Sequence, residues 1–247
     1  MRYFIDLSFN GKNYHGWQHQ PNATTIQDIL EKTLSTMLRE NIKITGAGRT
    51  DTGVHAKQMI AHFDFNELED LSNFVFKLNS FLPKDISINN IIPVKEESHA
   101  RFDAIQRTYE YVITCKKDPF LQDFAYFIHQ LPDINTMNEA SKLLLNYNDF
   151  QCFSRSKTDV KTYHCIIKEV NWKLENDKLT FTISADRFLR NMVRAVVGTL
   201  LEIGYGTISM DGLHEIIKSK DRSNAGKSVP AHGLYLTGVI YPKGIMI

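Results

Sequence analysis

The sequence predicts an α/β fold built from two similar halves. Two kinds of apolar periodicity carry this prediction. Some segments alternate apolar and polar residues, which is typical of strands with one buried face, and others repeat apolar residues at helical spacing. Strand and helix patterns alternate within each half, and no long linker rich in Pro or Ser separates the halves. We therefore expect halves at residues 1–105 and 106–247, with one continuous sheet and a central cleft.

The first half has the pattern of a β-α-β-α-β unit. Residues 2–9 place apolar side chains at every second position, as a half-buried strand does. Residues 26–38 then repeat apolar side chains at helical spacing. Thr25, with Asp28 three residues later, resembles a capping box at the start of that helix. The other elements expected in this half are a strand at 59–65, a helix at 71–81 and a strand at 86–92.

The second half begins and ends with expected strands, at 107–114 and 234–241. Between them the pattern predicts a helix at 134–146, paired strands at 163–174 and 178–184, and a long helix at 188–203. On a helical wheel drawn from Arg187, the apolar residues of this last helix lie on one side. Arg187, Arg190 and Arg194 lie on the other. The sequence thus predicts a helix with one core face and one cationic face.

The composition is that of a globular protein. The chain has 247 residues and 43% hydrophobic content, which is enough for a sizeable core. No signal-peptide pattern opens the sequence, and no apolar run approaches the roughly 20 residues that cross a bilayer, so we expect no membrane association. The cysteines, Cys115, Cys152 and Cys165, form no CxxC pair. Their odd number and spacing favour a reduced, cytoplasmic setting without disulfides or a zinc cluster.

The charge is distributed unevenly along the chain. Residues 1–105 carry 11 basic and 13 acidic side chains, whereas residues 106–247 carry 18 and 15, so the net charges of the halves are −2 and +3. Affinity for nucleic-acid phosphates comes from clustered Lys and Arg side chains. With a net charge of only +1 for the whole chain, a nucleic-acid surface on this protein must be a local basic stripe.

Residues 46–56, GAGRTDTGVHA, are the most informative stretch of the chain. Glycines in this loop allow positive φ and close approach of the backbone to a ligand. Arg49 supplies a planar donor fork suited to phosphate, and Asp51 is the one carboxylate of the loop. A surface turn uses the same residue types. The loop alone therefore supports an active site and a turn about equally.

The loop resembles the signature loop of the TruA family of tRNA pseudouridine synthases, and four further blocks resemble that family in order. They are YHGWQHQ at 14–20, HARFDAIQRTYEY at 99–111, FLRNMVRAVVGTLLEIGYG at 188–206 and PAHGLYLTGVIY at 230–241. The resemblance therefore covers nearly the whole chain. Two departures are Thr52, where the family usually has Ala, and the charged lead-in of the third block, with Asp186, Arg187 and Arg190.

The resemblance implies the pseudouridine synthase fold, a mixed and mainly antiparallel sheet with helices packed on it. It also implies a homodimer that modifies uridines 38, 39 and 40 in the anticodon stem-loop of tRNA. In this family the aspartate corresponding to Asp51 attacks the target nucleotide, and the tyrosine corresponding to Tyr109 lines the uracil pocket. A basic residue corresponding to Arg194 pairs with the aspartate. Attack of Asp51 on C1′, attack on C6 and proton removal all stay open.

The other candidate RNA-binding residues are cationic. Arg49 either fills the space left by a flipped nucleotide or grips its phosphate, because an enzyme that acts on a base must take it out of the stack. The structural alternative for Arg49 is a salt bridge with a neighbouring carboxylate. For Arg187 and Arg190, phosphate binding and a solvated basic face are equally supported. Arg155 and Lys157 lie in a sparse basic loop that either touches phosphates or remains solvated.

Pseudouridine formation needs no cofactor, because the uracil is detached from the sugar at N1 and rejoined at C5 without net redox change. No HxE, HExxH or CxxC element is present, so we assign no metal. His55 is either a ligand or proton carrier or, as we favour, a packing or hydrogen-bonding residue, and Trp17 either lines the RNA path or, as we favour, packs in the core. The alternative function is a catalytically silent tRNA-binding or RNA-folding module on the same fold, against which the intact Asp51 argues. A phosphate-cradling nucleotide enzyme is excluded, because no Lys followed by Ser or Thr comes after Gly48.

Overall fold

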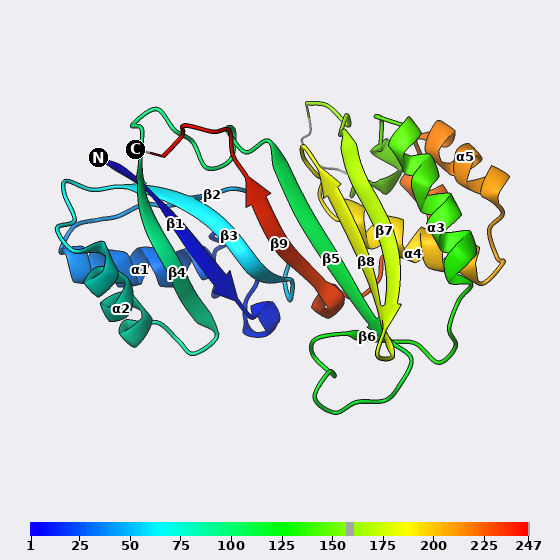
Figure 1. Ribbon diagram of the computed structural model, residues 1–247, viewed down its shortest axis with the longest axis horizontal. Coiled ribbons are helices and arrows are strands. Elements are labelled where there is room, and N and C mark those ends of the chain that lie inside the picture. Colours follow the sequence, from blue (N-terminus) through cyan, green and yellow to red (C-terminus); the bar gives the residue numbers. More distant parts are fainter. Residues whose placement is uncertain (157–160, 247) are drawn as a thin grey trace. The chain divides into compact units, whose positions relative to one another are not determined.

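A computed structural model of the protein describes residues 1–156 and 161–246 (Figure 1). The chain divides into two compact units. Unit 1 comprises Met1–Gln106 and Tyr235–Ile247, and unit 2 comprises Arg107–Leu234. This division differs from the expected halves in one respect, because the last strand of the chain belongs to unit 1. Within unit 1, this strand pairs with a strand of the first half.

The sheet of unit 1 is mixed and mainly antiparallel. Its strand order is β4 (Ile86–Val94), β1 (Arg2–Phe9), β3 (His55–Asp64) and β9 (Leu234–Ile240), and the short β2 (Thr45–Gly46) pairs with β3. The pairs β1–β3, β1–β4 and β2–β3 are antiparallel, whereas β3 and β9 run parallel, with His55 opposite Tyr235. The alternation of β1 buries Ile5 and Leu7 completely, as the period of two predicts.

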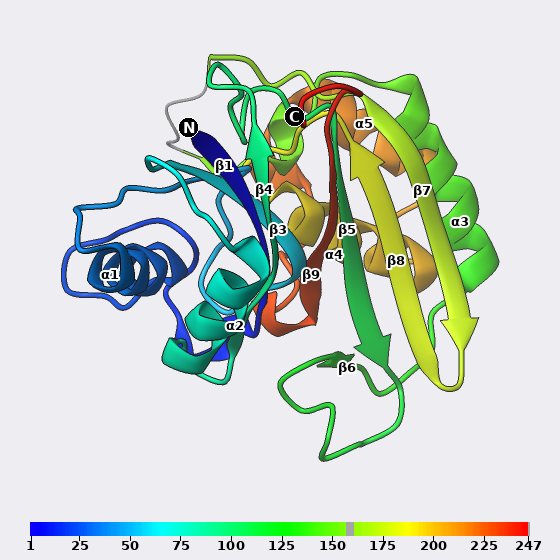
Figure 2. The same cartoon turned by 60° about the vertical axis from the view of Figure 1, so that its left-hand side comes forward.

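Two helices accompany this sheet, and both confirm the sequence prediction. Helix α1 (Ile26–Leu38) starts at Thr25, whose side chain accepts a hydrogen bond from the Asp28 amide. It ends at Arg39, which has a left-handed φ of 56°. Helix α2 (Leu71–Phe81) is capped by Asp70 and packs on β4. Figure 2 shows the two helices next to each other.

Unit 2 has its own mainly antiparallel strands, in the order β5 (Gln106–Thr114), β8 (Lys178–Ala185) and β7 (Ile167–Glu175). The short β6 (Tyr126–Phe127) runs parallel to β5. Asn176 and Asp177 join β7 to β8, with φ values of 49° and 64°. Positive φ at both residues is what a two-residue hairpin of type I′ requires, and Asn and Asp tolerate it well. The paired strands expected here are confirmed, although β7 begins at Ile167 instead of residue 163.

The helices of unit 2 are α3 (Ile134–Leu143), α4 (Met192–Gly204) and α5 (Met210–Ser219). Figure 2 shows them behind the strands of this unit, and α3 packs on both β7 and α4. The sequence prediction omitted α5, although Ser209 caps it and its buried residues Leu213, Ile216 and Ile217 have helical spacing. Short 3-10 turns occupy Gly11–Asn13, Leu144–Asn146, Gln151–Phe153, Arg222–Asn224 and Ala231–Gly233.

The prediction for α4 was wrong in two respects. The helix begins at Met192 and not at residue 188, because Asn191 has a φ of 66°, which no right-handed helix contains. The helix is also buried around most of its circumference, with ten of its 13 residues inaccessible. The side expected to be cationic is covered by residues 225–229, and Gly198 lies directly against Lys227 of that segment. Helix α4 is therefore a core helix with no extended cationic face.

Candidate active site

The loop that carries Asp51 connects β2 to β3 in unit 1. The Val54 amide donates to the Asp51 carbonyl at 3.2 Å. Gly53 has a φ of 79°, a conformation that L residues with a side chain rarely adopt. Asp51 is half-buried and Arg49 is exposed. The loop thus presents a carboxylate and a guanidinium from one tight turn next to the start of β3.

The chain segment before α1 packs under this loop. The Trp17 amide donates to the Thr50 carbonyl at 3.3 Å, and the Gly53 amide donates to the Tyr14 carbonyl at 3.4 Å. The Trp17 side chain is buried, and a methyl group added at Gly46 would lie 2.5 Å from its ring. Trp17 is therefore a packing residue, as interpreted from the sequence.

Two polar residues of the loop region are buried. His55 accepts a hydrogen bond from the Gly11 amide at its Nδ1, at 3.1 Å, and its ring stacks on Tyr235. This confirms His55 as a packing and hydrogen-bonding residue. The Thr50 hydroxyl oxygen is also buried and has no hydrogen-bond partner among the residues that the structure describes. A buried unpaired hydroxyl costs free energy, so the surrounding contacts must hold Thr50 in place.

Tyr109 and Tyr111 lie on β5 of unit 2 and differ in their surroundings. Tyr109 is half-buried, stands opposite Ile183 of β8, and meets the Phe188 ring edge-on at 5.1 Å. Tyr111 is fully buried and donates to the Pro230 carbonyl at 2.8 Å. Burial raises the pKa of Tyr111 far above its ordinary value. Tyr111 is thus structural, as expected, whereas Tyr109 has a partly accessible ring held by Phe188.

Arg194 lies in the first turn of α4. Its Nε donates to the Val229 carbonyl at 2.7 Å, and its own carbonyl accepts from the Val229 amide at 3.2 Å. The side chain is half-buried. The bond at Nε restricts the rotation of the guanidinium, and the backbone bond holds Val229 next to the first turn of α4. Nothing in the sequence pattern pointed to Val229, since it lies 35 residues further along the chain.

The other described arginines that were expected to bind RNA in unit 2 lie outside helix α4. Arg187 and Arg190 belong to the connection from β8 to α4, so their assignment to a helical face is corrected. The Arg190 carbonyl accepts a hydrogen bond from the Arg155 amide at 3.0 Å, and both side chains are exposed. Arg187 is half-buried next to Asp186, whose carboxylate accepts from the Arg187 amide. Lys157 lies outside the described residues.

The structure therefore assembles part of the expected site in each unit. Arg49 and Asp51 share the loop of unit 1. In unit 2, Arg155 and Arg190 are brought together from segments far apart in the sequence. Tyr109 and Arg194 are fixed there by Phe188 and Val229. The sequence analysis missed the roles of these two partners, although Phe188 is part of the FLRNM block.

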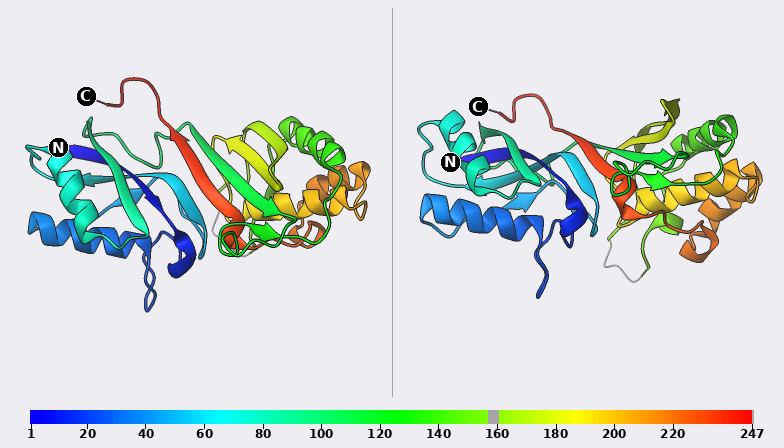
Figure 3. Two further views of the ribbon diagram at one scale, coloured as in Figure 1. Left: turned by 60° about the horizontal axis from the view of Figure 1, so that its bottom comes forward. Right: turned by 90° about the horizontal axis from the view of Figure 1, so that it is seen from below.

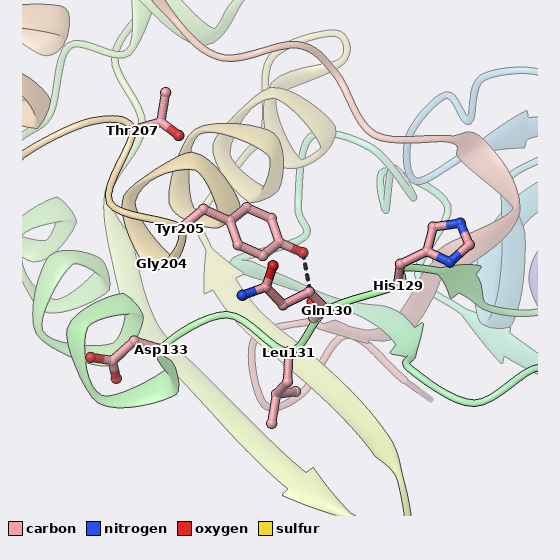
Figure 4. A pocket seen from close by; sticks show the side chains of 7 residues that line it. All are labelled: His129, Gln130, Leu131, Asp133, Gly204, Tyr205 and Thr207. Atoms are coloured by element: carbon pink, nitrogen blue, oxygen red, sulfur yellow. Dashed lines mark hydrogen bonds between the residues drawn. The ribbon is translucent and has the colours of Figure 1, made fainter.

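A separate hollow of about 580 Å³ lies in unit 2 near the end of α4. Figure 4 shows the residues that line it, and the Tyr205 hydroxyl donates to the Gln130 carbonyl at 2.8 Å across it. Its lining residues are His129, Gln130, Leu131, Asp133, Gly204, Tyr205 and Thr207. None of the residues expected to bind RNA or act in catalysis belongs to this set. The hollow is thus distinct from the site elements described above.

Three further features bear on the chemistry of the part of the chain that the structure describes: metal-ligand clusters, cysteines and long apolar helices. Within residues 1–156 and 161–246, no group of three or more His, Cys, Asp or Glu side chains is arranged to hold a metal ion. The three cysteines are free thiols, and burial raises the pKa of both Cys152 and Cys165 to about 12. No described helix is long and apolar enough to cross a bilayer.

Comparison with known proteins covers both units. A family model described as tRNA pseudouridine synthase matches residues 7–103 and 140–242. The chain belongs to this family. Its curated relatives named tRNA pseudouridine synthase A include a protein of Parabacteroides distasonis, 54% identical over 98% of this chain and 96% of the relative. Another, from Porphyromonas gingivalis, is 47% identical over 100% of this chain and 99% of the relative.

A more distant relative, tRNA pseudouridine synthase A 2 of Clostridium perfringens, is 39% identical over 96% of this chain and 98% of its own length. The mixed, mainly antiparallel α/β architecture is consistent with the pseudouridine synthase fold. The first segment matched by the family model contains Asp51, and the second contains Arg194. Tyr109 lies between the two matched segments, in a stretch that the alignments with these relatives span.

Proposed function

We propose that this protein converts uridine to pseudouridine at positions 38, 39 and 40 in the anticodon stem-loop of tRNA. The observation that carries the proposal is the Asp51 loop, a partly accessible carboxylate on a backbone-anchored turn, in a chain that belongs to the tRNA pseudouridine synthase family. The protein is then an isomerase, working in the cytoplasm where tRNA is modified.

The reaction balances without an added reactant. The N1–C1′ bond breaks, the uracil turns, and a C5–C1′ bond forms. The proton lost from C5 is matched by one gained at N1, so no oxidant, reductant or cofactor is consumed. The protein has to supply a nucleophile, a pocket that retains the detached uracil, and a proton carrier.

The described residues can meet these demands. We assign Asp51 as the nucleophile. The family resemblance pairs it with Arg194, and a cation paired with a carboxylate favours the ionised form. Tyr109 stacks on the uracil and relays a proton through its hydroxyl. Arg49 stabilises the flipped-out nucleotide. The bond from Arg194 to Val229 supports this role, since a guanidinium with restricted rotation is preorganised.

An assay of the purified chain tests the proposal directly. The protein is incubated with an unmodified tRNA transcript in metal-chelating buffer without nucleotide, and pseudouridine is mapped by position. We expect conversion at positions 38–40. Binding without conversion would instead identify the silent RNA-binding module.

Arg194→Lys keeps the charge but removes the fork of donors. A hydrogen bond to a charged group contributes roughly 1.5–3 kcal/mol, so we expect kcat to fall roughly tenfold to a hundredfold with little change in tRNA affinity. Arg222→Lys is the matched control, because Arg222 also donates to the segment at 225–229, through Ala225 and Ser228. Single-turnover kinetics on both variants decide the question. Equal rates for the two would mean that Arg194 only braces that segment.

Tyr109→Phe preserves the ring that meets Phe188 and deletes the hydroxyl. General acid–base catalysis contributes roughly 10²–10⁴ in rate, so we expect kcat to fall by about a hundredfold or more while KM changes little. Tyr205→Phe, which removes a hydroxyl at the hollow in Figure 4, should leave the rate unchanged. A Tyr109→Phe enzyme with near-normal turnover would leave the ring as the only contribution of this residue.

The tRNA body requires more cationic surface than one chain offers, since the net charge is only +1. Arg155, Arg187 and Arg190 are the described candidates for a basic stripe, and Lys157, the other candidate, lies outside the described residues. A homodimer presents two such stripes to one tRNA. Light scattering should therefore find a dimer, with tRNA affinity that falls steeply as salt concentration rises. A monomer with full activity at nanomolar concentration would contradict this assembly.

A further inference from the structure

We propose that residues 10–17 form a clamp that positions Asp51 for attack, and that Asp85 sets the clamp through the Tyr14 hydroxyl. The inference rests on the proposed function, because it assigns a role toward the nucleophile of that reaction. All of its residues belong to unit 1. Figure 3 shows where this segment lies, between the end of β1 and the start of α1.

The clamp holds the Asp51 loop on both sides of the carboxylate. On one side, the Thr50 carbonyl accepts from the Trp17 amide at 3.3 Å, and on the other, the Gly53 amide donates to the Tyr14 carbonyl at 3.4 Å. Gly16 lies between these contacts with a φ of 85°. A methyl group there would lie 2.3 Å from the Thr50 carbonyl oxygen. Backbone contact this close transmits a shift of the clamp directly to Asp51.

Asp85 anchors the clamp to the sheet. Its carboxylate accepts from the Tyr14 hydroxyl at 2.5 Å and from the Asn13 amide group at 3.2 Å. Its carbonyl accepts from the Asn10 amide at 2.9 Å. Asp85 comes directly before β4, a strand in the same sheet as β3, which follows the Asp51 loop. The anchor therefore ties the loop to the rigid part of unit 1.

The Tyr14 hydroxyl is suited to this task because it stays a donor. The side chain is 5% exposed. Burial, reinforced by the hydrogen bond to Asp85, raises the pKa of Tyr14 well above its ordinary value. A hydrogen bond from a hydroxyl to a carboxylate is short and strong in such surroundings. The contact thus holds the Tyr14 hydroxyl in one geometry against Asp85.

The sheet does not depend on this one hydroxyl. The cores of β1 and α1 consist of apolar side chains such as Ile5, Leu7 and Leu30. Without the Tyr14 hydroxyl, Asp85 keeps its bonds with Asn10 and Asn13. Loss of the hydroxyl should therefore loosen the loop more than it weakens the fold. Misplacement of a reacting group by about 1 Å costs up to a hundredfold in rate.

Tyr14→Phe tests the clamp against Tyr241→Phe. The Tyr241 hydroxyl donates to the Ala100 carbonyl at 2.6 Å in the same unit and takes no part in the clamp. We expect Tyr14→Phe to lower kcat by about tenfold or more. Its KM and tRNA affinity should stay within about twofold of the parent. Tyr241→Phe should keep the parental kcat. The two variants should melt at similar temperatures. Equal kcat in both would overturn the proposal.

A double-mutant cycle gives the second measurement. If Tyr14 and Asp85 act as one unit, combining Tyr14→Phe with Asp85→Ala should lower kcat no further than the stronger single variant does. Additive losses would mean that the two residues act separately, and would overturn the proposal. Asp85→Asn keeps a carbonyl acceptor and should give an intermediate kcat. If Tyr14→Phe does not fold, Asp85→Asn replaces it as the test. A parental kcat for Asp85→Asn would then overturn the proposal.

Asp51→Asn is measured in parallel so that two failures can be told apart. If Asp51→Asn still turns over, the assignment of the nucleophile fails, and with it the basis of the clamp. If Asp51→Asn is inactive while Tyr14→Phe matches Tyr241→Phe, the proposed function stands and the clamp alone is refuted.

Discussion

Asp51→Asn should abolish pseudouridine formation and leave tRNA binding intact. Asparagine has nearly the same shape as aspartate but carries no charge and is a poor nucleophile. Removal of a nucleophile commonly costs about a thousandfold or more in kcat. The backbone of Thr50, Asp51 and Gly53 makes hydrogen bonds that do not involve the Asp51 carboxylate, and these should help the loop to keep its conformation. Mapping of pseudouridine measures the activity, and a tRNA-binding isotherm on the same preparation measures the affinity.

Asp70→Asn is the control for this change. Asp70 belongs to the same unit and caps α2 by accepting from the Asn73 amide, a task that asparagine performs equally well. Its variant should match the parent in rate, affinity and melting temperature. Appreciable pseudouridine from Asp51→Asn would contradict the central assignment, whatever the control shows.

Gly198→Ala should be the most damaging of the small substitutions. Alanine ordinarily stabilises a helix interior by about 1 kcal/mol relative to glycine. Here the added methyl would lie 1.8 Å from the Lys227 carbonyl oxygen, a separation that backbone atoms must widen. Overpacking of this kind costs about 1–3 kcal/mol or more, so we expect a net loss of stability. Urea unfolding followed by tryptophan fluorescence gives its size.

The same substitution should slow catalysis, because the displaced segment at 225–229 includes the Val229 carbonyl that holds Arg194. Gly212→Ala in α5 is the matched control. The nearest neighbour of its methyl would be a side-chain methyl of Ile208 at 3.1 Å and not a backbone atom, so helix propensity should offset the slight crowding. Unchanged stability of Gly198→Ala would mean that α4 and Lys227 do not pack as closely as described.

The sequence by itself determined the features that depend on residues close together in the chain. The alternation of β1, the helical spacing of α1 and the cap at Thr25 depend on near neighbours, so the pattern alone predicts these elements. The Asp51 loop was recognisable for the same reason, since its glycines and charged residues are contiguous. The family, too, followed from ordered blocks of sequence.

Tertiary structure decided everything that depends on contacts between distant segments. Helix α4 looked amphipathic, but residues 225–229 cover its polar side, and the left-handed Asn191 excludes Arg187 and Arg190 from it. The last strand belongs to unit 1, where it pairs with β3, a strand far from it in the sequence. The hydrogen bond between Tyr14 and Asp85 spans 71 residues. No periodicity records such a pair, because periodicity reports which side of an element is apolar and not what packs against it.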